Sequence, residues 1–335
     1  MARYLKPFLV ASIFATCLGT SALMLAGPER VVVLSDLQYV PWYAYLAAAL
    51  FATALSYTMG WAARAMAVAS VGLVLVVVMD LNLGTPAKGA RTVRLMTFNV
   101  KDYETLASPT GGGAVLAREV MRFDPDIAVF QDASDFYDVI EPQNLFPGRK
   151  IFGSDELSIV SRYPIENCRD EIEKLPAKSL HHVACEVHGR DWTIDVHVVH
   201  LVSPRLGLTA WRYGPIRGVR EWDNNVEGRM GQAVALRRYV AGAKYPAVIA
   251  GDLNAPPHSL VLRVFTDAGF RDAFDAAGVG YGFTYGHIFP PHLDFLRLDH
   301  VLVDGSIDVA DCFVAPAGVS PHRAVVADLV LKPER

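Results

Sequence analysis

Two long uncharged runs near the start of the chain constrain its fold more than any other feature of the sequence. Residues 8–27 contain no charged side chain, and residues 40–63 form a second such run. A helix of about twenty apolar residues is long enough to cross the hydrocarbon core of a bilayer. A third run, residues 65–79, is shorter and reaches this length if Trp61–Ala63 extends it. The sequence therefore predicts three transmembrane helices, at about residues 8–27, 40–61 and 63–83.

Basic residues around these runs predict the orientation of the chain in a membrane. Arg3 and Lys6 precede the first run, and Arg64 lies in the tight connection between the second and the third. Cytoplasmic loops carry an excess of Lys and Arg. We therefore predict a multi-pass protein of the cell membrane whose second domain is extracytoplasmic, either periplasmic or extracellular. A cleaved signal peptide in place of the first span leaves this location unchanged, whereas a buried core helix in place of one span puts the second domain in the cytoplasm.

The rest of the chain has the composition of an ordinary globular domain. Hydrophobic residues make up 52% of the sequence and the mean hydropathy is +0.25, but most of the apolar excess precedes Asp80. We predict a membrane region at residues 1–84, a linker at 85–91 and a second domain at 92–335. Even a dozen extended residues span only about 40 Å, so the second domain should work close to the bilayer. The net charge of −4 gives no overall attraction to nucleic acid.

Two cysteines flank a predicted turn in the second domain. Cys168 and Cys185 lie at nearly equal distances from the turn at Pro176–Ser179. A hairpin at this turn brings them opposite each other, and an oxidising compartment then permits a disulfide. A slip of one residue in the strand register separates them, so two unpaired thiols are the alternative.

Strand-like and helix-like segments alternate in the second domain. Short apolar runs typical of strands lie at residues 93–98, 127–130, 193–199, 247–250, 300–303 and 325–331. Segments with the longer apolar period of helices lie at residues 114–123, 231–243 and 259–268. This alternation predicts an α/β layered fold with a largely buried sheet.

Polar side chains gather where these predicted strands end. They are Asn99, Asp132, His200, Asp252, Asn254, Asp299 and His322. Such a set predicts one site at the edge of a sheet sandwich. Mg²⁺ prefers oxygen ligands, so we predict that Asn99 and Asp132 bind Mg²⁺ (or Mn²⁺).

Short segments around these residues follow a recognisable order along the chain. They are Thr97–Val100, Pro125–Asp132, Ser158–Ile165, His200–Leu201, Gly251–Ala255, Leu298–Leu302 and Ser320–Arg323. Together they resemble the motifs of the endonuclease/exonuclease/phosphatase family, in a membrane-anchored, bacterial-type member, over roughly residues 91–331. Gly-Asp-x-Asn-Ala at 251–255 is the most specific element. The resemblance implies a four-layer α/β sandwich, in which helices flank two packed β-sheets.

The same resemblance implies a metal-dependent hydrolase of phosphoric esters with five catalytic residues. Asp252 positions or deprotonates the attacking water, and Asn254 holds Asp252 and a phosphate oxygen. His200 donates to the phosphoryl group. His322 contacts the scissile phosphate, and Asp299 orients its imidazole. Whether Asp252 or His322 is the kinetic base stays open.

Two positions depart from the family pattern, and both lie on the metal side of the site. The family's Glu after the second strand is Asp132 here, and the Asp that usually precedes the last His is Pro321. We expect an active enzyme, namely a phosphodiesterase that acts near the membrane surface on nucleic acid or phospholipid headgroups. The alternative is a membrane-tethered protein that binds phosphate esters with weakened catalysis. Membrane lipid is the other expected partner, and no feature points to a protein partner.

The segment that follows His200 bears on the substrate. Between Arg205 and Arg229, arginines alternate with Trp211, Tyr213 and Trp222. We predict a long surface loop here. Its aromatic side chains either stack on nucleic-acid bases, lie at the lipid headgroup layer, or pack beneath the loop.

Overall fold

Apolar helices form the first part of the chain in the computed structural model, which describes residues 2–88, 92–108, 111–286 and 293–333. Three α-helices pack on one another around small side chains such as Ala52 and Ala67. They are α1 (Ala2–Ala26), α2 (Trp42–Ser56) and α3 (Trp61–Leu73), with η1 (Pro28–Tyr39) between α1 and α2 and η2 (Val74–Val78) continuing α3. The chain divides into two units: Met1–Leu81 with Pro256–Leu260, and Asn82–Ala255 with Val261–Arg335.

Two helices among the described residues are long and apolar enough to cross a membrane, Tyr4–Ala26 and Trp61–Val78. The helix between them, α2, is apolar but has 15 residues. That is a length of about 22 Å, against a hydrocarbon core of about 30 Å. Each predicted span thus contains a helix, but the middle helix is shorter than predicted. That all three cross a membrane stays a prediction, and part of the predicted linker, residues 89–91, lies outside the described residues.

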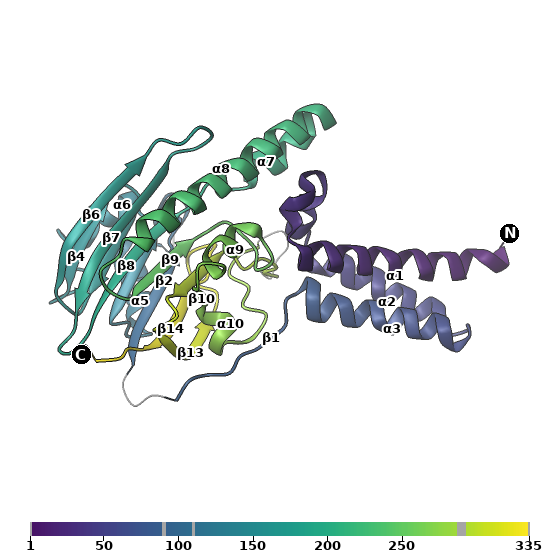
Figure 1. Ribbon diagram of the computed structural model, residues 1–335, viewed down its shortest axis with the longest axis horizontal. Coiled ribbons are helices and arrows are strands. Elements are labelled where there is room, and N and C mark those ends of the chain that lie inside the picture. The colour runs from purple at the N-terminus through teal and green to yellow at the C-terminus, as the bar shows by residue number, and fades with distance from the viewer. Residues whose placement is uncertain (1, 89–91, 109–110, 287–292, 334–335) are drawn as a thin grey trace. The chain divides into compact units, whose positions relative to one another are not determined.

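Two six-stranded sheets form the core of the second unit (Figure 1). The first sheet has the order β13 (Asp308–Val314), β14 (Val325–Val330), β2 (Val93–Asn99), β3 (Ile127–Gln131), β5 (Leu157–Ser161) and β4 (Lys150–Ser154). The second has the order β10 (Arg271–Asp272), β12 (Asp299–Val303), β9 (Ala247–Asp252), β8 (Thr193–His200), β7 (Leu180–His188) and β6 (Ile165–Glu173). Neighbouring strands are antiparallel, except that β2 pairs with β3 and β8 with β9 in parallel. A short ribbon pairs β1 (Asn82–Leu83) with β11 (Val279–Gly280).

Alternate side chains of the strands face different apolar layers, as the two-residue period of a strand requires. In β2, Val93 and Leu95 lie between the sheets, whereas Met96 and Phe98 face the helices α5 (Gly113–Met121) and α6 (Ser134–Ile140). The outer face of the second sheet packs against the helices α8 (Pro215–Ala241) and α9 (Leu260–Thr266). The remaining helices are α4 (Asp102–Leu106) and α10 (Ala273–Ala277). The second unit is therefore a four-layer α/β sandwich, as predicted.

The segment from Arg205 to Arg229, which we predicted as a surface loop, is helical. The helices α7 (Arg205–Ala210) and η3 (Trp211–Tyr213) lead into α8, which has 27 residues. Its buried residues recur at helical spacing, at Gly218, Trp222, Val226, Arg229, Ala233, Leu236 and Val240. The loop prediction was wrong because an arginine and a glycine lie within this stripe. The helix predicted at 231–243 is only the second half of α8.

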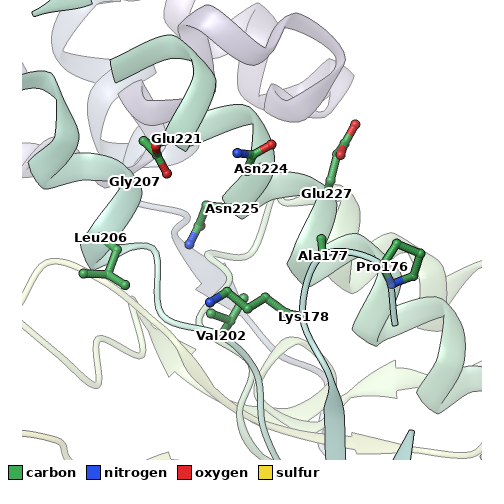
Figure 2. A pocket seen from close by; sticks show the side chains of 10 residues that line it. All are labelled: Pro176, Ala177, Lys178, Val202, Leu206, Gly207, Glu221, Asn224, Asn225 and Glu227. Atoms are coloured by element: carbon green, nitrogen blue, oxygen red, sulfur yellow. The ribbon is translucent and has the colours of Figure 1, made fainter. Parts of the chain in front are cut away.

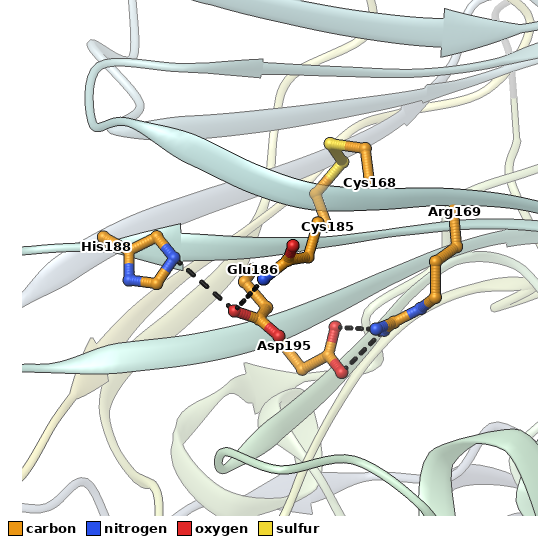
Figure 3. Close-up of a disulfide and its surroundings, with 7 residues drawn as sticks. Cys168, Arg169, Cys185, Glu186, His188 and Asp195 are labelled. Atoms are coloured by element: carbon orange, nitrogen blue, oxygen red, sulfur yellow. Dashed lines mark hydrogen bonds and ion pairs between the residues drawn. A yellow bond between two sulfur atoms is a disulfide. The ribbon is translucent and has the colours of Figure 1, made fainter.

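Cys168 and Cys185 form a disulfide between β6 and β7, as Figure 3 shows. The register of this strand pair shifts between Glu166 and Arg169. Asn167 has a φ of 48°, the left-handed conformation that bulges often contain. The bulge brings Cys168 opposite Cys185, and their Cα atoms lie 4.1 Å apart. The sequence left this pairing open, and in the structure the bulge provides the register that allows it.

Replacing both cysteines with serine should destabilise the second unit. The disulfide joins residues 17 positions apart, and closing a loop of this length is worth about 3 kcal/mol in the chain-entropy account. This corresponds to a fall in melting temperature of roughly 6–12 °C. Thermal unfolding of Cys168→Ser/Cys185→Ser and of the parent, each with and without a phosphine reductant, measures it. The reductant should lower the melting temperature of the parent and leave that of the variant unchanged. If the parent without reductant melts at the same temperature as the variant, the thiols are unpaired.

Candidate active site

Three neighbouring strands of the second sheet end in site residues at the same level. His200 lies opposite Asp252, and Asp252 lies opposite Asp299, so β8, β9 and β12 bring the three side chains together. Gly251 precedes Asp252 at a point where an added Cβ would lie 1.9 Å from the Val199 carbonyl oxygen. Because any side chain would collide there, glycine is required for the close approach of β8 and β9. This explains the first residue of the Gly-Asp-x-Asn motif.

The buried carboxylate of Asp252 lies at the centre of the site. Its Oδ2 accepts a hydrogen bond from Asn99 Nδ2 at 3.0 Å, and its Oδ1 accepts one from the backbone N–H of Asn254 at 2.8 Å. Asn99 ends β2 of the first sheet, so this bond joins the two sheets. Burial and then the charge of Asp299 raise the pKa of Asp252, against the opposing charges of two nearby imidazoles. A raised pKa makes a carboxylate a better general base near neutral pH.

Two imidazoles flank Asp252, and each is held by a carboxylate of its own. His322 Nδ1 lies 2.9 Å from Asp299 Oδ2, and His322 Nε2 lies 3.9 Å from Asp252 Oδ2. His200 Nδ1 lies 2.9 Å from Glu156 Oε2, and His200 Nε2 lies 3.6 Å from Asp252 Oδ2. A carboxylate at Nδ1 fixes the ring and leaves Nε2 facing the site. Both rings thus present Nε2 toward one carboxylate oxygen.

The carboxylate partners favour the cationic forms of both rings. Burial lowers the pKa of His200, but the hydrogen bond that its Nδ1–H donates to Glu156 and the charges of nearby carboxylates outweigh burial and raise the pKa to about 9. Burial also opposes the charge of His322, but the charge and hydrogen bond of Asp299 outweigh it, so the pKa of His322 is raised. His200 is therefore protonated at neutral pH and donates through Nε2.

Asn254 is held from two directions. Its Nδ2 donates to the carbonyl oxygen of Leu201 at 2.8 Å, and Arg229 Nη1 donates to the carbonyl oxygen of Asn254 at 2.7 Å. Arg229 is fully buried, with its guanidinium 5.5 Å from the ring centre of Trp222. The φ of Asn254 is 50°, a left-handed conformation that asparagine adopts more readily than most residues. A buried cation of α8 thus supports the turn after Asp252.

The loop before β14 is tied to the same site through Ser320. Its Oγ donates to the carbonyl oxygen of Asn99 at 2.8 Å and accepts from the backbone N–H of His322 at 3.1 Å. The ring of Tyr285 lies 4.6 Å from the imidazole of His322, at 37° to it. Pro321 therefore lies between two residues, Ser320 and His322, that hydrogen bonds hold in place. Tyr285 was not predicted as a site residue, because an aromatic residue outside any motif has no distinguishing sequence pattern.

Lys101 lies on the metal side of the predicted site. Its Nζ is 2.8 Å from Asp132 Oδ2, and its backbone N–H donates to Asn99 Oδ1 at 3.1 Å. Lys101 and Asp132 both have left-handed backbones, with φ of 46° and 51°. Such conformations are uncommon outside glycine and cluster at functional sites. One lysine therefore contacts both predicted metal ligands.

The donor atoms of the site fit a hard divalent cation. Carboxylate and amide oxygens are the ligands that magnesium and manganese prefer. Within the described part of the chain, Asp252, Asp299 and His322 offer ligand atoms that lie within 4.8 Å of one another. Over the same residues, the buried Oδ1 of Asp299 has no hydrogen-bond partner. A buried carboxylate oxygen without a protein donor usually has an ordered water or a cation as its partner. The assignment of Asn99 and Asp132 as metal ligands stays a prediction.

The structure places the predicted residues around one point. His200, Asp252 and Asp299 share one sheet edge, Asn99 reaches them from the other sheet, and Asn254 and His322 follow on loops. Asp132 follows β3 and pairs with Lys101. Glu156, Lys101 and Tyr285 also contact these residues but were not predicted from the sequence.

A cavity of about 470 Å³ lies beside the site, between the β6–β7 turn and the helices α7 and α8 (Figure 2). Lys178 of the turn and Asn225 of α8 point into it. His182 of β7 pairs with Val199 of β8, so this turn lies at the same sheet edge as His200.

Comparison with known proteins agrees with this geometry. Residues 96–322, more than half of the chain, match the Endonuclease/Exonuclease/phosphatase family. No curated protein matches the chain.

Similar solved structures include an endonuclease/exonuclease/phosphatase from Beutenbergia cavernae, with 20% identity, a TM-score of 0.51 and coverage of 72% of each chain. One from Bacteroides vulgatus has 15% identity and a TM-score of 0.57 over 72% of this chain and 100% of that chain. The human Nocturnin catalytic domain with bound sulfate has 16% identity and a TM-score of 0.53, over 72% of this chain and 95% of that chain. At these identities the likeness concerns the fold. The family match over residues 96–322 shows that this protein belongs to the endonuclease/exonuclease/phosphatase family of phosphate-ester hydrolases.

Proposed function

We propose that this protein is a metal-dependent phosphodiesterase that acts close to a membrane surface. The observation that carries the proposal is the buried carboxylate of Asp252 between two imidazoles, each held by its own carboxylate. This arrangement combines a base with N–H donors around one point, which hydrolysis of a phosphate ester requires. A protein that only binds phosphate esters has no need for a carboxylate that faces an anionic ligand.

Asp252 is the base in this proposal. Its pKa is raised, whereas Asp299 favours the cationic form of His322, which has no lone pair with which to accept a proton. The N–H donors of Asn99 and Asn254 hold both oxygens of Asp252 in place. Asp252 orients a water molecule and takes its proton as the oxygen attacks phosphorus. The P–O bond to the leaving alcohol breaks, and the departing alkoxide takes a proton from water.

The two imidazoles act on the phosphoryl group. His200 and His322 donate through Nε2 to the oxygens on which negative charge develops, and their carboxylate partners keep them aligned. Asn99 and Asp132 would hold a divalent cation, which would neutralise the non-bridging oxygens when bound.

Two features support a location at the outer surface of a membrane. Among the described residues, two helices are long and apolar enough to span it. The Cys168–Cys185 disulfide is typical of oxidising compartments outside the cytoplasm. The reductant experiment described above tests this part of the proposal, because reduced thiols in the native protein would contradict it.

A substrate panel tests the activity itself. Full-length protein, dialysed against a chelator, would be assayed on bis(p-nitrophenyl) phosphate, single-stranded DNA, duplex DNA, RNA and phospholipid vesicles. We expect turnover of at least one diester after Mg²⁺ or Mn²⁺ is added and none before. Binding of a phosphate ester without turnover under either metal would identify a binding protein instead.

Lys101→Met should tighten Mn²⁺ binding by about tenfold. The substitution removes a partly exposed ion pair from Asp132 and one positive charge beside the proposed metal; such a pair contributes about 0.2–1 kcal/mol, and relief of repulsion adds to it. Titration calorimetry of the dialysed protein measures the affinity without any assay of turnover. Lys178→Met, at the neighbouring cavity, is the matched control. An unchanged affinity in Lys101→Met would show that Asp132 does not bind the metal.

A further inference from the structure

The turn between α7 and α8 presents apolar and basic side chains together to solvent. Leu206, Tyr213 and Ile216 are 71%, 69% and 88% exposed. Residues 205–220, which we call the α7–α8 tip, contain four arginines and no acidic residue. Arg217 lies over the ring of Tyr213, at 4.6 Å from its centre. Exposed aliphatic side chains surrounded by arginine are typical of surfaces that lie in a membrane interface.

The aromatic residues of this segment are not arranged to stack on nucleic-acid bases. Trp222 is fully buried. The ring of Trp211 fills the space beside Gly218, where an added Cβ would lie 2.6 Å from the ring. Only Tyr213 of the three is exposed, and Arg217 covers one of its faces. Stacking on single strands uses successive exposed aromatic rings, whereas Leu206 and Ile216 gain by leaving water for a lipid interface.

We propose that the α7–α8 tip docks on the anionic headgroups of a lipid bilayer. Tyr213 and Ile216 enter the interface, and Arg212 and Arg217, which are exposed, contact lipid phosphates. Arg220 is paired with Glu221 at 3.4 Å. Charge complementarity selects this occupant, because the tip carries only positive charge and the surfaces of anionic membranes attract clustered Lys and Arg.

Docking at the tip has a consequence for the substrate, and this consequence rests on the proposed function. α7 begins five residues after His200, and α8 also carries Arg229, which supports Asn254. A tip that lies on headgroups therefore presents the site to phosphodiesters of the lipid surface. The proposal accordingly assigns lipid headgroup phosphodiesters as the substrate class.

Position-specific quenching tests the docking in the full-length chain. Ile216→Cys would be labelled with an environment-sensitive fluorophore and reconstituted in vesicles of phosphatidylcholine with 30% phosphatidylserine and a spin-labelled lipid. Labelling is specific within the described residues, because Cys17 and Cys312 are buried and the other two cysteines form the disulfide. Met121→Cys, at a position on α5 that is 38% exposed, is the matched control.

We expect quenching at position 216 to be at least threefold stronger than at position 121. It should fall by at least half in Arg212→Glu/Arg217→Glu and in vesicles without phosphatidylserine. Equal quenching at both positions would overturn the proposal, and so would a fluorophore that responds to single-stranded DNA but not to lipid. Hydrolysis of bis(p-nitrophenyl) phosphate by the same labelled protein reports separately on the proposed function. If the labelled protein hydrolyses the ester but shows no quenching, the docking proposal is wrong and the proposed function stands. If quenching occurs but the parent hydrolyses no ester, the proposed function is wrong and the docking proposal stands.

Discussion

Asp252→Asn should lower the turnover of a phosphodiester by about 10³- to 10⁴-fold, the range of a lost general base. The amide has nearly the same shape and can still accept the hydrogen bond from the Asn254 backbone, but it cannot take a proton from water. Because the change also removes a buried charge that Asp299 repels, the melting temperature should change little. Steady-state kinetics at saturating metal, with thermal unfolding of the same samples, measures both effects.

A second buried aspartate of the same sheet provides a control for Asp252→Asn. Asp195 lies on β8 and pairs with Arg169 away from the site, as Figure 3 shows. Asp195→Asn should weaken folding without changing turnover per folded molecule. If Asp252→Asn kept near-normal turnover and an unchanged metal requirement, Asp252 would not be the base.

His322→Ala should have the second largest effect, a loss of turnover of about 10³-fold. It removes the donor that faces the phosphoryl oxygens and leaves Asp299 without its imidazole partner. His322→Gln would retain an N–H donor and should recover part of the loss. Equal activity of the alanine variant and the parent would exclude His322 from the reaction.

A substitution at Asp299 tests whether this carboxylate only positions the imidazole of His322 or also keeps it in the form that donates a hydrogen bond. Asp299→Asn keeps the imidazole but removes the charge that raises its pKa. The cationic form of His322 donates, so activity that depends on it is present below the pKa and is lost as the pH rises through it. Because the substitution lowers that pKa, the alkaline loss of activity should move to lower pH. A pH–rate profile with the same alkaline limb as the parent would mean that Asp299 has only a structural role.

Much of this site could be predicted because strand ends have a clear sequence signature. A short apolar run next to an Asp, Asn or His located four strands: the polar residue ends β2, β8 and β9, and Asp299 begins β12. The four-layer fold followed from the order of the motifs. Registers such as His200 opposite Asp252 could not be predicted, because strand pairing depends on contacts that are remote in the sequence.

The residues that were missed have no local pattern of their own. Glu156 lies in the turn between β4 and β5 and becomes important only because β5 places it beside His200. From the sequence alone, Lys101 resembles any surface lysine, because its partner Asp132 comes next to it only through the turn after β3. The sequence did contain a signal for the first half of α8, because Trp222, Val226 and Arg229 continue the helical spacing of the helix predicted after them. The signal was not used because arginine is rarely buried in an apolar stripe.

The strand β14 determines when this protein can acquire activity during its synthesis. It inserts between β13 and β2, and its partner residues in β2 were made more than two hundred residues earlier. His322 and Ser320, which complete the site, immediately precede β14. Contacts between residues so distant in sequence form slowly, since a long loop must close first. On the proposed function, a nascent chain therefore has no complete active site until β14 has left the ribosome.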